Sequence, residues 1–127
     1  MNLRIQYFTR SRYYNGDESN FTPSRVVVHD TGGGNNKLNR YVPDYYKYPT
    51  CGNAYDNHWD TPNALGVHAW IGLDFDNKTL ATVQALPWGC CGAHAGSCMQ
   101  KTTEHTVQKS YCADVSLPRL LASRFSF

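Results

Sequence analysis

The order of apolar and polar positions predicts short β-strands in the first quarter of the chain. Residues 3–8 alternate apolar and polar side chains, as expected of a strand or an extended arm. Three valines precede His29 in the segment 25–29, and this run is too short and too β-branched to favour a helix. Glycines at 32–34 then permit a sharp backbone turn. A buried strand that ends at His29 is therefore predicted.

Further strands are predicted in the second half of the chain. Residues 66–72 and 79–86 are apolar segments joined by an Asp-Asn turn, and together they predict a β-hairpin over 67–86. Pro87 ends this hairpin, because proline cannot donate to a strand ladder. Residues 107–115 show a weaker strand pattern.

The segment 31–64 has no helical period longer than about two turns. It predicts one short helix within 37–46, interrupted by Pro43, and residues 117–124 predict another helical turn or two. So long an irregular segment in a small domain is usually functional or mobile. Because strand outweighs helix, we expect a sheet with one face poorly covered.

Length and composition indicate one small domain, residues 1–127, without a strong electrostatic field. The net charge is +2, 17% of the residues are charged, and the cations form no basic run. We therefore expect neither nucleic acid nor a membrane as a partner, and we expect a monomer. No stretch is apolar enough to span a bilayer, and the N-terminus lacks the apolar core of a signal peptide.

The five cysteines do not predict a disulfide framework. Their number is odd, and a bond between the adjacent Cys90 and Cys91 would be strained, so a reducing compartment or an anaerobic source is expected. An alternative is a structural zinc site in the segment 90–98, which also contains His94 and Cys98.

His29 is the first candidate for chemistry. A histidine at a strand end stands at the rim of a sheet, where the strand fixes the imidazole and the open turn admits substrate. The alternative is a structural histidine bonded to a neighbouring carbonyl. His58, in the aromatic-rich segment 41–59, is predicted to be a surface loop residue.

Three motifs occur in a familiar order: the valine strand that ends at His29, the hairpin that begins with His68-Ala69-Trp70, and the loop Gly92-Ala93-His94-Ala95-Gly96 after Leu86-Pro87-Trp88. In order and spacing, residues 24–97 resemble the zinc-dependent N-acetylmuramoyl-L-alanine amidases, which share a fold with the peptidoglycan recognition proteins.

The resemblance implies roles for particular residues. His29 corresponds to a zinc ligand, so Zn²⁺ is the expected cofactor. His68, His94 and Trp70 are then expected to bind substrate, a muramyl-peptide of peptidoglycan, and the segment 41–59 would border the groove. The expected reaction is hydrolysis of the amide between N-acetylmuramic acid and L-alanine.

The resemblance also implies an α/β fold, with a mixed central β-sheet, flanking helices and an incomplete C-terminal part. Relatives carry a catalytic glutamate and the remaining zinc ligands beyond the His94 loop. Here Glu104 is the only glutamate downstream of that loop and is the candidate base, whereas His105, Cys98, Cys112 and Asp114 are possible further ligands.

Two other functions stay open at this stage. One is a non-catalytic module that binds muramyl-peptide without zinc, and the other is an inactive fragment of an amidase. The compartment is not predicted, although a phage-type lysin without a signal peptide, acting on the cell wall, fits the N-terminal sequence.

Overall fold

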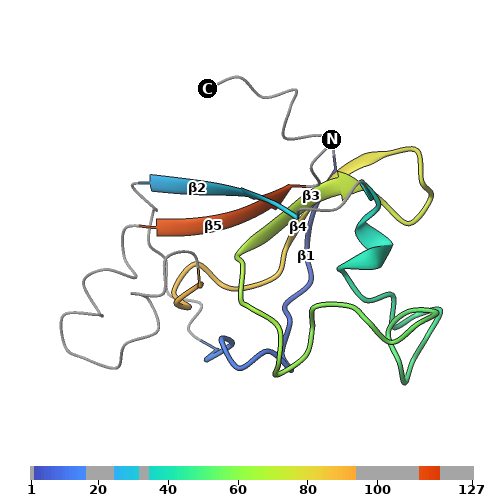
Figure 1. The fold of residues 1–127 in the computed structure, drawn as a ribbon, viewed down its shortest axis with the longest axis horizontal. Helices are drawn as coiled ribbons and strands as arrows, with labels where there is room; N and C mark the ends of the chain where they lie inside the picture. Colours follow the sequence, from blue (N-terminus) through green and yellow to red (C-terminus); the bar gives the residue numbers. More distant parts are fainter. Residues whose placement is uncertain (1, 17–24, 32–34, 94–111, 118–127) are drawn as a thin grey trace.

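A five-stranded mixed sheet forms the centre of the molecule (Figure 1). The computed structural model describes residues 2–16, 25–31, 35–93 and 112–117. The sheet order is β1-β4-β3-β5-β2, so β1 and β2 are its edges. The strands are β1 (Asn2–Ile5), β2 (Arg25–Asp30), β3 (Ala69–Leu73), β4 (Leu80–Gln84) and β5 (Cys112–Leu117). β3 and β4 are antiparallel, and every other neighbouring pair is parallel.

The valine run and the hairpin form strands as predicted, but the prediction that the valine strand is buried is wrong: β2 is an edge strand, and Val26 and Val28 are 62% and 40% exposed. β2 begins at Arg25 and continues one residue past His29, and β3 and β4 form the predicted hairpin. Asp76 organises its turn: the carboxylate accepts hydrogen bonds from the backbone of Lys78 and Thr79, both at 2.9 Å, and from the Thr79 hydroxyl. These hydrogen bonds lower the pKa of Asp76 to about 2.

The prediction of an α/β fold with helices flanking the sheet is wrong for the described residues. They contain no α-helix, and the helix expected within 37–46 is a single 3-10 turn, η1 (Leu38–Arg40), which ends before Pro43. Short polar side chains hold this segment in turns instead. Asn35, Asp44 and Asn53 each accept hydrogen bonds from backbone N–H groups a few residues further on, which competes with helix formation.

The two faces of the sheet differ sharply in burial. On one face Trp70, Val83 and Ala81 pack with Leu38, Val42, Tyr41 and Phe8 in the main core. Figure 1 shows η1 and the chain that follows it beside β3. On the other face Leu3, Ile5, Val26 and Val28 are exposed, with exposed fractions between 40% and 73%. Gln84 and Ala69 lie in register between Ile5 and Val28 and are 8% and 3% exposed, so this face is open along its two edge strands and covered at its centre.

The remaining predicted elements lie wholly or partly outside the described residues. β5 covers the end of the strand predicted over 107–115, and the helical turn predicted over 117–124 lies outside apart from its first residue. Among the described residues, no helix is both long and apolar enough to cross a bilayer.

Candidate functional site

His29 lies on the same face of the sheet as Trp70. Ser116 of β5 is in register with His29 of β2 on one side and with Trp70 of β3 on the other. Residues in register across a sheet direct their side chains to the same face. The histidine at the end of the valine strand therefore shares a face with the indole of the hairpin.

The two side chains line one pocket of about 190 Å³, here called the His29 pocket. His29, Asp30 and Thr31 come from the end of β2, and the other lining residues come from the chain before β3, from β3 itself and from the chain after Pro87: Trp59, Leu65, Val67, Trp70 and Ala93. The pocket is thus mainly apolar, with three polar side chains along one border. Small-molecule sites commonly combine apolar walls with a few convergent polar groups.

Stacked aromatic rings fix the position of Trp70. Its ring lies parallel to that of Tyr41, with centroids 4.9 Å apart and an interplanar angle of 9°, and meets Trp59 edge-on at 5.0 Å. The Tyr41 hydroxyl donates to the Thr31 hydroxyl at 3.1 Å, which joins this stack to the end of β2. Trp70 is only 1% exposed, and its indole Nε1 has no hydrogen-bond partner in the described structure. A buried indole N–H usually has a partner.

The sequence did not indicate the structural role of Tyr41. The sequence placed it only in the aromatic-rich segment expected to border a groove. In the structure Tyr41 contacts both Trp70 and Thr31, two residues that line the His29 pocket, and so helps to hold them in position. Neither contact could be predicted from the separation of these residues along the chain.

His68 is buried next to the His29 pocket and is absent from its lining. Its Nε2 lies 2.9 Å from the carbonyl oxygen of Cys90, and because a carbonyl only accepts, Nε2 carries the proton. Its ring also stacks on Trp88, with centroids 5.6 Å apart. In the described structure His68 links the start of the hairpin to the chain after Pro87, and Val67 lines the pocket in its place. A substrate-binding role for His68 stays a prediction.

His94 and Glu104 lie outside the described residues, so their predicted roles are not placed in the structure. The same holds for His105 and Cys98. A catalytic zinc site needs three protein ligands and an open position. Among the residues whose side chains the structure describes, which do not include Cys112 and Asp114, no group of three His, Cys, Asp or Glu residues is arranged to hold a metal ion. Of the ligands predicted for a catalytic zinc ion, only His29 has a described side chain.

The prediction that His58 is a surface residue is wrong. It is 3% exposed, and its Nδ1 accepts a hydrogen bond from the backbone N–H of Asp60 at 3.1 Å. Burial lowers the pKa of His58, because the charged ring loses its hydration. His58 is not among the residues that line the His29 pocket, so its role is to hold the loop.

Comparison with known proteins does not assign this chain to a family. No family model, no curated protein and no solved structure matches it.

Proposed function

We propose that this protein acts on peptidoglycan as an N-acetylmuramoyl-L-alanine amidase, with the His29 pocket as the muramyl-peptide site. The observation that carries the proposal is that His29 and Trp70, from two motifs some forty residues apart, line one pocket. The resemblance requires His29 to share a cleft with His68 as well as with Trp70, and of these two only Trp70 lines the His29 pocket.

The lining of the pocket, which has a volume of about 190 Å³, suits the amide-bearing end of a muramyl-peptide, where the lactyl unit is joined to L-alanine. The apolar side chains of Leu65, Val67 and Trp59 can pack against the methyl groups of the lactyl unit and of L-alanine. The indole of Trp70 contributes a further apolar wall. His29 stands at the border of the pocket, where an imidazole can coordinate a metal ion or bond to the substrate.

Zinc remains a proposed cofactor. When bound in such a site, zinc polarises an amide carbonyl and activates water. The described residues contribute His29 to it, and the additional ligands would have to come from elsewhere in the chain. The described residues of the pocket would therefore bind and orient the substrate.

A second function is a non-catalytic module that binds muramyl-peptide. The pocket needs no metal to bind a ligand. Both functions require the same pocket. The amidase also cleaves the amide bond of the bound muramyl-peptide, whereas the module only binds it.

One experiment separates them. The purified protein is loaded with zinc and incubated with peptidoglycan, and both new L-alanine amino termini and zinc per chain are measured. The amidase predicts cleavage and one zinc ion, both lost in His29→Ala and both retained in the control Lys78→Gln, at an exposed residue outside the pocket. Saturable binding of muramyl-peptide without cleavage supports the module instead. Absence of both cleavage and binding from a folded protein contradicts both functions.

A further inference from the structure

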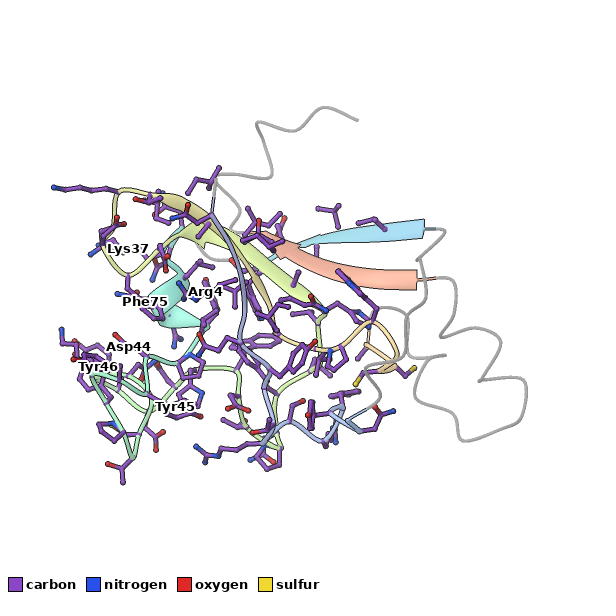
Figure 2. All side chains as sticks on the ribbon, turned by 180° about the vertical axis from the view of Figure 1, so that it is seen from behind. Arg4, Lys37, Asp44, Tyr45, Tyr46 and Phe75 are labelled. Carbon is purple, nitrogen blue, oxygen red and sulfur yellow. The ribbon has the colours of Figure 1, made fainter. Side chains whose placement is uncertain are left out.

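We propose that a second pocket, separate from the His29 pocket, binds an acidic sugar residue. This pocket, here called the loop pocket, has a volume of about 210 Å³ and lies between η1, the segment after it and the β3–β4 turn. Its lining includes Asn39, Arg40, Lys47, Tyr55, Asn57 and Phe75, and it shares no residue with the His29 pocket. Figure 2 shows Phe75 and Asp44, which also lines it, on one side of the molecule next to η1.

The size of the loop pocket fits one sugar ring. Pockets for drug-sized ligands usually begin at about 300 Å³, so this pocket suits a smaller group. It is built from segments well separated in the sequence, because Phe75 follows β3 whereas Asn39 and Asn57 precede it.

Asn53 holds the polar side of the pocket in shape. It is 6% exposed, and its amide oxygen accepts hydrogen bonds from the backbone N–H groups of Tyr55 and Asn57, both at 3.1 Å. Its amide nitrogen donates to the Asn57 side-chain oxygen at 2.8 Å. Asn53 thus uses its own hydrogen-bonding groups to fix the chain around it, and the pocket is formed before any ligand arrives.

Polar groups at the pocket remain available for a ligand. In the part of the chain that the structure describes, the side-chain amide of Asn39 and the amide nitrogen of Asn57 make no hydrogen bond. A primary amide both donates and accepts, which matches the hydroxyl and acetamido groups of a sugar. The rings of Tyr55 and Phe75 offer apolar surfaces on which a sugar ring can pack.

The charges favour an acidic ligand over a neutral one. Arg40 and Lys47 line the pocket, and Asp44 is the one carboxylate among the lining residues. The Asp44 carboxylate accepts a hydrogen bond from the Lys47 backbone N–H at 3.0 Å, and neither cation forms an ion pair within the described residues. One Arg40 N–H donates to the Asn57 carbonyl at 3.1 Å, which orients the guanidinium at the pocket while other N–H groups remain for a carboxylate.

The test compares two sugars that differ in one group. N-Acetylmuramic acid carries a lactyl carboxylate that N-acetylglucosamine lacks, and each is titrated into the ¹⁵N-labelled protein while backbone and side-chain amide signals are recorded. The proposal predicts that N-acetylmuramic acid shifts the amide signals of Asn39 and Asn57 and binds more tightly. Arg40→Gln and Lys47→Gln should each weaken it about fivefold. Lys78→Gln, at an exposed lysine outside the pocket, is the matched control and should leave the affinity unchanged.

Three results would overturn the proposal: no shift at Asn39 or Asn57, equal affinity for the two sugars, or equal weakening by Lys78→Gln. The outcome is separable from that of the proposed function, because His29→Ala removes amidase activity without touching the loop pocket. The same titration of His29→Ala should therefore give unchanged shifts at Asn57.

Discussion

At the scale of single residues, the loop before β3 is stabilised by buried polar groups. The ring of His58 meets the Tyr45 ring edge-on at 5.8 Å, and the Tyr45 hydroxyl donates to the Asp60 carboxylate at 2.8 Å. Asp60 also accepts a hydrogen bond from the Arg10 backbone N–H, which ties the loop to the N-terminal segment. Gly52 permits this packing: its φ is +74°, and a Cβ there would lie 2.4 Å from the His58 Nε2.

The buried His58 predicts that stability falls in mild acid. Its pKa in the folded protein is below the ordinary value of 6.5, because burial disfavours the charged ring. The unfolded chain therefore binds the proton at higher pH than the folded chain does. The His58 contribution is complete above about pH 6.5 and is lost as the pH falls below it.

The substitution His58→Asn, which keeps an acceptor for the Asp60 N–H, should flatten this dependence. Thermal unfolding of both proteins between about pH 7.5 and pH 5 gives the measurement. An equal loss of stability in the variant and the unchanged protein would show that another group is responsible.

At the scale of elements, η1 is held against β3 through the backbone. The Leu73 N–H donates to the Asn36 carbonyl at 2.8 Å, and Lys37 forms an isolated parallel bridge with Leu73. Gly72 makes this approach possible, because a Cβ there would lie 2.8 Å from the same Asn36 oxygen and 3.2 Å from Leu38. An added Cβ would thus meet the backbone oxygen of Asn36 and the fully buried side chain of Leu38, and both have little freedom to move.

Gly72→Ala should therefore destabilise the fold by about 1–3 kcal/mol and separate η1 from the sheet. The free energy of unfolding in urea measures the first effect. Hydrogen exchange of the Leu73 amide measures the second, since its bond to Asn36 should open. A variant as stable as the unchanged protein, with the Leu73 amide still protected, would contradict the close approach.

The elements also show how far the sequence could predict the fold. The valine strand and the hairpin were predictable because their side-chain patterns are local and match the period of a strand. The turns of the segment 35–68 were not, because Asn and Asp side chains satisfy backbone groups in ways that no periodic pattern records. The burial of His58 and the contact of Tyr41 with Thr31 depend on tertiary packing for the same reason.

The candidate site was predictable only in part. The resemblance placed His29 and Trp70 together, and the two residues do line one pocket. It also grouped His68 with them, whereas the His68 ring lies against Trp88 and the Cys90 carbonyl. A side chain one residue before a strand can turn away from the face of that strand, and the alternation along the sequence does not show which way it turns.

At the scale of the whole molecule, the sheet has one packed face and one exposed apolar face. Val83 is fully buried in the core, whereas Val26 is 62% exposed on the opposite face. The exposed apolar side chains of this second face lie on the edge strands β1 and β2, with the buried Gln84 and Ala69 between them.

Two matched substitutions test this assignment of faces. Val83→Ala should lower the free energy of unfolding by about 2 kcal/mol, because it leaves a cavity in the core. Val26→Ala removes the same atoms from an exposed position and should change stability by less than about 0.5 kcal/mol. Chemical denaturation of both variants gives the comparison. A loss at Val26 as large as that at Val83 would show that the second face is covered.

The proposed function places the lactyl–alanine end of a muramyl-peptide in the His29 pocket. The most direct test is a titration of the ¹⁵N-labelled protein with N-acetylmuramoyl-L-alanyl-D-isoglutamine, while the indole and backbone N–H signals are followed. The account predicts saturable shifts of the Trp70 and Trp59 indole N–H groups and of the His29 and Thr31 amides. Saturation without any shift of these four signals, or no binding to the folded protein, would contradict it.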